Sequence, residues 1–306
     1  MQCISLTDQI KLKNTIVTIG KFDGIHRGHE KLFEEIAKHA NGRQRVVLTF
    51  ETSPKAFLDN HANKTIVTET EKQMLCQQQG INVYIKMPLK REFLALSPDE
   101  FVNDILKEKL GATTIVCGTD FRFGAKAEGD VEFLKRNQKK YGYHVVVVEK
   151  EKYHNKDISS SAIRERICAG DMLEVNAMLD HPYSIIGKVE HGKRLGRTIG
   201  FPTVNMFPED TKLLPPNGVY RSAAIIGGEK YNSISNIGIN PTVESGKQIK
   251  VETHIIDYKE YIYNEIVQVQ FFEFIRPERA FNNVEELKNQ IQIDMKKCRD
   301  IIGAER

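Results

Sequence analysis

Two histidines stand three residues apart in a glycine-rich segment near the start of the 306-residue chain. His26 and His29 belong to residues 20–29, which read GKFDGIHRGH between a short apolar run and an amphipathic run that begins at His29. This layout predicts a strand, a glycine loop and a helix, which together present backbone N–H groups and a positive helix end to an anion. Because imidazoles beside that anion can stabilise negative charge, the segment is predicted to act on a phosphate group.

Two common phosphate-binding loops do not describe residues 20–29. The segment lacks the Gly-Lys-Ser/Thr ending of a P-loop, and it departs from the G-x-G-x-x-G pattern of dinucleotide-binding domains. The remaining pattern, H-x-G-H, resembles the signature of nucleotidyltransferases, which act on the α-phosphate of a nucleoside triphosphate. A solvated loop or a metal site is the alternative for two histidines near glycines.

A second candidate loop, residues 117–130, follows another apolar run and reads CGTDFRFGAKAEGD. Asp120, Phe121 and Phe123 offer a carboxylate and two aromatic rings, and loops at strand ends often carry function. A surface loop with two phenylalanines packed beneath it is the alternative.

A third candidate, residues 157–167, reads DISSSAIRERI. Serines before an apolar-periodic run predict a helix N-terminus, where hydroxyl and N–H groups could receive phosphate oxygens. Arg164 would follow one turn into that helix and could face the same phosphate with its guanidinium group. A simple N-cap without a ligand would explain the serines as well.

The first part of the chain alternates short apolar runs with amphipathic ones, a pattern typical of a doubly wound parallel sheet with helices on both faces. Strands are expected at residues 16–19, 45–50, 82–86, 113–117 and 144–149, and helices from residue 29 and at 72–79, 97–110, 130–141 and 174–179. Ligands of such sheets bind at the carboxyl ends of the strands. Residues 20–29 and 117–130 both follow such an end.

The pattern changes after residue 182, so domains are expected at residues 1–182 and 183–306. Strands are predicted at residues 183–189, 219–226, 231–237, 249–256 and 266–274, with glycine and proline turns between them. This spacing is typical of a small antiparallel β-barrel. Apolar residues at helical spacing in residues 284–302 predict a terminal helix packed on the barrel.

Residues 187–205 read GKVEHGKRLGRTIGFPTVN, a cation-rich glycine loop suited to polyphosphate. Thr203 and Asn205 lie on one face of an extended segment, and their neutral oxygens suit Mg²⁺, which keeps waters and substrate phosphates as ligands. The alternative is a basic hairpin tip. Further on, Glu252 alternates with Val251 and Thr253. A carboxylate on an inward strand face is a candidate general base, and an exposed strand glutamate is the alternative.

These motifs together resemble the bacterial bifunctional riboflavin kinase/FAD synthetase family over nearly the whole chain. The resemblance rests on GKFDGIHRGH, GTDFRFG and ISSSAIR in the first half, and on the glycine loop, PTVN, residues 236–242 (NIGINPT, taken as a turn) and Glu252 in the second. It implies an adenylyltransferase domain with catalytic His26, His29 and Arg164, and a kinase domain with Glu252 as the catalytic base.

The same resemblance implies the remaining contacts. ATP is expected to contact Gly20, Phe22, Asp23, Gly24, Gly28, Ser159, Ser160, Ser161, Gly192, Lys193, Gly196 and Arg197. Flavin is expected to contact Asp120, Phe121, Phe123, Gly124, Asn236, Pro241 and Thr242, and Mg²⁺ to be held by Thr203 and Asn205. The implied ligands are riboflavin, FMN, FAD and ATP, with a homo-oligomer possible.

The chain departs from the family pattern at three places. Thr52-Ser53 stands where a Pro-His pair is frequent, Val243 where an aromatic residue is usual, and Asn264 where glycine is usual. These changes bear on flavin binding and leave two alternatives: an adenylyltransferase whose barrel only binds flavin or regulates, or a non-catalytic flavin sensor.

Composition narrows the class further. A hydrophobic content of 40% with 28% charged residues is typical of a globular protein with a real core, and a net charge of +3 is too small to indicate a nucleic acid or membrane partner. No apolar window is long enough to span a bilayer, and no signal peptide is expected. Five scattered cysteines without a C-x-x-C pattern indicate a reducing compartment, the cytoplasm.

Overall fold

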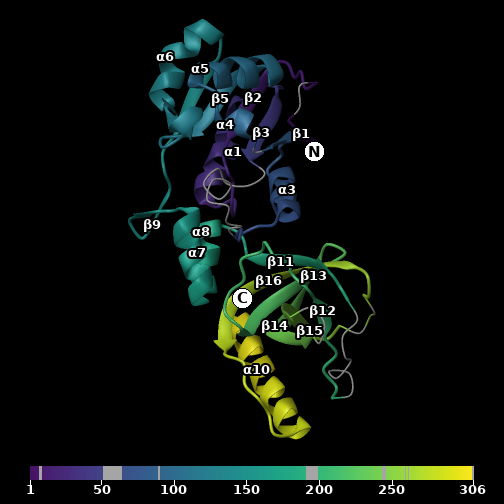
Figure 1. Ribbon diagram of the computed structural model, residues 1–306. Coiled ribbons are helices and arrows are strands. Elements are labelled where there is room, and N and C mark those ends of the chain that lie inside the picture. Colours follow the sequence, from purple (N-terminus) through teal and green to yellow (C-terminus); the bar gives the residue numbers. More distant parts are fainter. Residues whose placement is uncertain are drawn as a thin grey trace. The chain divides into compact units, whose positions relative to one another are not determined.

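The computed structural model describes residues 1–6, 9–50, 64–88, 90–190, 199–242, 246–258, 260 and 262–304, and only the backbone of residues 240–242, 246–247 and 299–304. Contacts divide the chain into two compact units, Met1–Ser160 and Ser161–Arg306. Each unit contains its own six-stranded sheet (Figure 1).

The sheet of the first unit is entirely parallel. Its strands lie in the order β1 (Gln2–Ser5), β4 (Val83–Met87), β3 (Gln44–Phe50), β2 (Thr15–Ile19), β5 (Ala112–Gly118) and β8 (His144–Val148). Alternate residues of β2 pack into two different core clusters. Val17 and Ile19 belong to one cluster and Ile16 belongs to the other, so both faces of the sheet are buried. The doubly wound parallel sheet predicted from the sequence is therefore confirmed.

Helices and short hairpins complete this unit. They are α1 (Arg27–His39), α3 (Glu69–Gln78), α4 (Arg91–Leu94), α5 (Pro98–Glu100), the π-helix η1 (Phe101–Lys109), the short helix η2 (Ala125–Ala127), α6 (Val131–Tyr141) and the pairs β6 (Arg122–Phe123) with β7 (Gly129–Asp130) and β9 (Lys152–Tyr153) with β10 (Lys156–Asp157). A capping box starts α5, since Ser97 N donates to Glu100 Oε2 at 2.7 Å and Glu100 N donates to Ser97 Oγ.

The second unit contains a nearly closed antiparallel barrel. Its strands lie in the order β11 (Ser184–Lys188), β16 (Ile266–Arg276), β13 (Gly218–Ile226), β14 (Glu229–Thr242), β15 (Gly246–Ile255) and β12 (Val204–Met206). Beyond β11, Glu190 N donates to Asn205 O at 2.8 Å and so brings the first strand to the last. The predicted barrel is confirmed, as is the terminal helix α10 (Val284–Ala304), which packs Cys298 against Val219 and Ile234.

Two helices precede the barrel, α7 (Ser160–Ala169) and α8 (Met172–Leu179). Asn176 of α8 donates from Nδ2 to Phe271 O at 2.9 Å and accepts from Tyr183 N at 2.8 Å. Contacts thus group these helices with the barrel, whereas a functional boundary at residue 182 stays a prediction.

Two expectations about local structure are wrong. Residues 236–242 form no turn, because β14 stays paired with β15 as far as Thr242 opposite Gly246. Helix α1 begins at Arg27 rather than at His29, because the carbonyl of His26 already accepts from His29 N and Glu30 N. His29 therefore lies inside the first turn, and His26 is the N-cap.

Candidate active sites

The first candidate site lies where the order of strand addition in the parallel sheet changes from one side of β2 to the other. From β2 the chain continues through β3 and β4 on one side, and β5 and β8 lie on the other side of β2. A crevice at the carboxyl ends of two such neighbouring strands is the usual ligand site of a doubly wound sheet. Residues 20–29 leave β2 and residues 118–124 leave β5, so the fold brings two of the predicted motifs together.

His26 and His29 form a stacked pair at the start of α1. Their ring centroids are 3.7 Å apart and the ring planes differ by 19°. Gly28 leaves room for this arrangement, since a Cβ there would come within 3.3 Å of the His26 ring. The rings of Phe22 and His29 meet edge to face, with their centroids 5.2 Å apart. The imidazoles are thus held at the positive end of a 13-residue helix.

His29 is adapted to stay neutral. Burial lowers its pKa well below the ordinary value, and the nearby His26 and Lys72 lower it further. Its Nδ1 atom is buried and has no hydrogen-bond partner in the part of the chain that the structure describes. A buried polar atom of this kind is costly without a partner, which favours a site completed by a ligand.

The loop before the histidines has an unusual backbone. Phe22, Gly24 and Ile25 have φ values of 49°, 95° and 45°. Phe22 and Ile25 are fully buried, and buried Asp23 accepts from Ile66 N at 2.8 Å, so packing holds this conformation. The side chains of Phe22 and Asp23 face the interior, and their direct contact with ATP stays a prediction.

The serine motif meets this loop directly. Ser160 Oγ donates to the carbonyl of Asp23 at 2.9 Å, and α7 begins at Ser160, which confirms the predicted helix N-terminus. Ser159 precedes the helix and is exposed. Ser161 and Arg164 belong to the second unit, and their approach to the phosphate site stays a prediction.

The loop after β5 has both a packed and an open part. Phe123 is buried among Phe101, Phe121 and Phe133, with centroids 5.4 to 5.8 Å apart, and Gly124 has a φ of 74° against Pro98. Packing therefore accounts for Phe123 and Gly124, and their contact with flavin stays a prediction.

Asp120 is exposed and pairs with Lys150 Nζ at 2.9 Å. Lys150 follows β8, the last strand of the sheet along the chain. Sequence analysis did not predict its pairing with Asp120, and only its position after an apolar run pointed to this end of the sheet.

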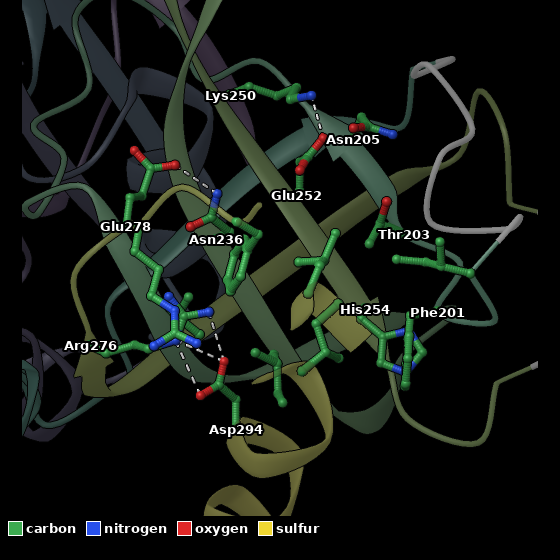
Figure 2. Close-up of a pocket in the computed structure, with 17 residues that line it drawn as sticks. Phe201, Thr203, Asn205, Asn236, Lys250, Glu252, His254, Arg276, Glu278 and Asp294 are labelled. Atoms are coloured by element: carbon green, nitrogen blue, oxygen red, sulfur yellow. Dashed lines mark hydrogen bonds and ion pairs between the residues drawn. The ribbon is translucent and has the colours of Figure 1, made fainter. Parts of the chain in front are cut away.

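The second candidate site is a pocket of about 290 Å³ beside α10 (Figure 2). Its apolar lining comprises Ile199, Phe201, Val219, Ile234, Phe281, Leu287 and Ile291. Its polar lining comprises Thr203, Asn205, Asn236, Lys250, Glu252, His254, Arg276, Glu278, Arg279 and Asp294. A mostly apolar concavity with a few convergent polar groups suits a flat aromatic ligand that carries a polar chain.

Three predicted residues form a row across this pocket. Glu252 on β15 is in register with Asn236 on β14 and with Asn205 on β12. Val251 and Thr253 are the fully buried residues of this stretch, so Glu252 lies on the other face of the sheet and not on the inward one. Its carboxylate lines the pocket, pairs with Lys250 and is about 36% exposed.

Thr203 and Asn205 line the same side of the pocket as Glu252 (Figure 2). Asn205 is 5% exposed, and its Oδ1 atom is buried without a hydrogen-bond partner among the described residues. A neutral oxygen acceptor in this state fits a cation such as Mg²⁺ that also binds substrate phosphates. The described residues contain no cluster of three or more His, Cys, Asp or Glu side chains suited to a metal.

Several predicted residues lie outside this description. Residues 191–198, which include Gly192, Lys193, Gly196 and Arg197, are not among the described residues, and neither are Val243 and Thr52-Ser53. Pro241 and Thr242 are described by backbone alone.

Asn264 has a φ of 66°, a left-handed conformation that asparagine tolerates better than most residues, so its replacement of the usual glycine fits the backbone.

The helical wall of the pocket contains a polar cluster that sequence analysis missed. Arg276 contacts Asp294 through Nε at 2.9 and 3.2 Å and through Nη2 at 2.9 Å (Figure 2). Gln290 Nε2 also donates to Asp294, at 2.7 Å. Asp294 is 2% exposed. The signal was present, because Asp294 interrupts the apolar stripe of α10 between Ile291 and Cys298.

The fold and the two sites define a two-domain protein in which a nucleotidyltransferase-like domain precedes a small β-barrel. Family models agree with this division: the FAD synthetase model matches residues 8–162 and the riboflavin kinase model matches residues 179–302.

Curated relatives match almost from end to end. The bifunctional riboflavin kinase/FMN adenylyltransferase of Escherichia coli strain K12 is 34% identical over 96% of this chain and 95% of its own. The protein of the same name from Bacillus subtilis strain 168 is 33% identical over 92% of this chain and 90% of its own. The chain belongs to the bifunctional riboflavin kinase/FMN adenylyltransferase family.

A solved structure shares the fold over the full length. A Streptococcus pneumoniae protein described as a macrolide-efflux protein superposes with a TM-score of 0.88 at 31% identity, covering 98% of this chain and 99% of that one. None of the helices described for the present chain is long and apolar enough to cross a membrane.

Proposed function

We propose that this chain makes FAD from riboflavin in two ATP-dependent steps, phosphorylation to FMN and adenylylation of FMN with release of pyrophosphate. The observation that carries this function is the presence of both enzyme domains in one chain, together with full-length similarity to relatives named for both activities. It favours the bifunctional enzyme over an adenylyltransferase with a barrel that only binds flavin.

Phosphorylation is assigned to the pocket beside α10. The riboflavin 5′-oxygen forms a bond to the γ-phosphorus of ATP, the bond from that phosphorus to its bridging oxygen breaks, and ADP leaves. Glu252 would accept the proton of the 5′-hydroxyl, and its ion pair with Lys250 would orient the carboxylate. The isoalloxazine ring suits the apolar wall that Leu287 and Ile291 form. Positioning and electrostatics then do most of the work, as in other phosphoryl transfers.

Thr203 and Asn205 are the residues that would hold Mg²⁺. The buried, unpartnered Asn205 Oδ1 supports this assignment. Bound there with ATP, the ion would neutralise charge on the phosphates. Replacing Asn205 with leucine should raise the Mg²⁺ concentration needed for half-maximal FMN formation.

Adenylyl transfer is assigned to the crevice beside β2 and β5. A phosphate oxygen of FMN attacks the α-phosphorus of a second ATP, and pyrophosphate departs. His26 and His29 stabilise the charge that develops on the α-phosphate, at the N-terminus of α1. Ser159, Ser160, Ser161 and Arg164 would hold the leaving phosphates.

The five cysteines are all free, which supports a reducing compartment, and we place both reactions in the cytoplasm. One chromatographic assay tests the function: riboflavin and FMN are offered separately with Mg-ATP. FMN and FAD from riboflavin, and FAD with pyrophosphate from FMN, are the expected products. Conversion of FMN alone would leave the adenylyltransferase reading, and no turnover of either flavin would leave only a flavin-binding protein.

A further inference from the structure

His254 lies two residues beyond Glu252 on the same face of β15, and both side chains line the pocket. The Nδ1 atom of His254 is 2.8 Å from the carbonyl oxygen of Pro202. Because a carbonyl oxygen only accepts hydrogen bonds, Nδ1 carries the proton and donates it. The histidine therefore connects β15 to the segment that leads into β12.

This hydrogen bond lies beyond the last backbone pair between β12 and β15. The ladder between β12 and β15 begins with Val204 opposite Thr253 and includes no residue before Val204. Pro202 has no N–H group to donate, so its carbonyl is the backbone group by which the chain can be held at this point. Thr203 thus stands between two fixed points, the first ladder pair and the hydrogen bond from His254.

A ring contact supports the same short segment. The rings of Phe201 and His254 meet edge to face, with centroids 5.5 Å apart and an interplanar angle of 82°. Such aromatic pairs add to the stability gained from burial alone. Two consecutive residues, Phe201 and Pro202, therefore rest on one side chain of β15.

We propose that His254 is a positioning residue that holds Thr203 and Asn205 in the orientation needed to bind Mg-ATP. The proposal rests on the kinase function assigned to this pocket. Residues that present oxygen atoms to an ion or a phosphate depend on neighbours that fix their direction, and a loose support weakens the site. His254 supplies that support from the strand that carries Glu252, so the proton acceptor and the metal-binding segment are fixed to the same element.

Two substitutions distinguish the effect of the His254 hydrogen bond from the effect of the volume that its ring fills. Asparagine at position 254 can place its amide nitrogen near the position of Nδ1 and keep the donor, whereas leucine fills the space without a donor. Hydrogen–deuterium exchange of residues 199–206, measured without nucleotide or metal, should be faster in His254→Leu and close to wild type in His254→Asn. His254→Gln carries its amide one bond further out and should behave like leucine, which keeps the test available should the leucine variant not fold.

Kinetics give the second measurement. Loss of one hydrogen bond should raise KM for Mg-ATP in riboflavin phosphorylation about three- to tenfold in His254→Leu, with a smaller change in kcat and no change in FMN adenylylation. His254→Asn should recover most of this loss.

Unchanged exchange in residues 199–206 of the leucine and glutamine variants would overturn the proposal. A fall in kcat without faster exchange would also overturn it, because His254 would then act on substrate directly. Should the wild-type chain form no FMN, the kinase assignment fails, and the exchange experiment still decides whether His254 holds this segment.

Discussion

The imidazole rings of His26 and His29 lie stacked 3.7 Å apart, one at the N-cap of α1 and the other in its first turn. Two protonated rings at this distance would repel each other, and burial further disfavours charge on His29. We therefore expect the pair to face negative charge on a bound ligand. In the adenylyl transfer proposed above, the α-phosphate of ATP would supply that charge.

Replacing His29 with alanine tests this arrangement. His29→Ala should reduce FAD formation from FMN by about 10²- to 10³-fold, because it removes one preorganised hydrogen-bond donor. FMN formation from riboflavin should stay intact, since the other unit carries the kinase site. His39→Ala, at the exposed end of the same helix, is the matched control. A folded His29→Ala protein that lost both activities would show that the two reactions do not have separate sites.

The pKa of His29 offers a second test, by NMR titration of the histidine ring protons. Lys72→Met should raise this pKa, because it removes one of the two neighbouring positive charges. The value should still stay below the ordinary one, since burial is the larger cause. Lys38→Met, an exposed lysine of α1 paired with Glu35, should leave it unchanged.

The lowered pKa of His29 determines the direction in which stability changes with pH. Below a pH of about 6.5 the unfolded chain gains a proton on His29 that the native state does not bind. The contribution of His29 should therefore make the first unit less stable as pH falls through this range, and His29→Gln should remove that part of the dependence. A steeper loss of stability at low pH in the glutamine variant would contradict the assignment.

Glu252→Gln tests the proposed role of Glu252 as proton acceptor in riboflavin phosphorylation. FMN formation should fall by about 10²- to 10⁴-fold, the usual contribution of a positioned general base, while FAD formation from FMN continues. Glu229→Gln, a barrel carboxylate outside the pocket, serves as the control. Full kinase activity in Glu252→Gln would assign proton removal to another group.

Much of the fold could be predicted because burial leaves a clear pattern in the sequence. All five residues of β2 are buried, and Ile16, Val17 and Ile19 make the segment rich in branched apolar residues. Strand β1 escaped prediction because it lies at the sheet edge and exposes Gln2, Cys3 and Ser5, so no apolar pattern marks it.

The sites were harder to predict than the sheets. The period of a strand placed Thr203 and Asn205 on one face, but the register that sets Asn205 opposite Glu252 depends on pairing between distant segments. Phe123 shows the converse difficulty, since an aromatic residue in a glycine loop reads the same whether it meets a ligand or a core. Only the fold distinguishes these cases.

The ion pair of Arg276 and Asp294 leads to a prediction about stability. Asp294 is almost fully buried, and its carboxylate accepts from Arg276 and Gln290, which joins α10 to the end of β16. Asp294→Asn keeps the shape but leaves a guanidinium group without its counter-charge. Breaking a buried pair from one side should lower the free energy of unfolding by about 3 kcal/mol. Calorimetry of the full chain should show this as a lower transition temperature for the second unit.

Two further variants show whether charge or packing is responsible. Glu285→Gln, in the exposed first turn of α10, should change stability by less than about 0.5 kcal/mol. Replacing both partners, Arg276→Met with Asp294→Leu, should recover most of the loss, because no buried charge is then left unpaired. A double variant as unstable as Asp294→Asn would mean that the helix depends on these side chains for shape rather than for charge. Helix α10 supplies the pocket wall formed by Leu287 and Ile291. Asp294→Asn should therefore also raise KM for riboflavin.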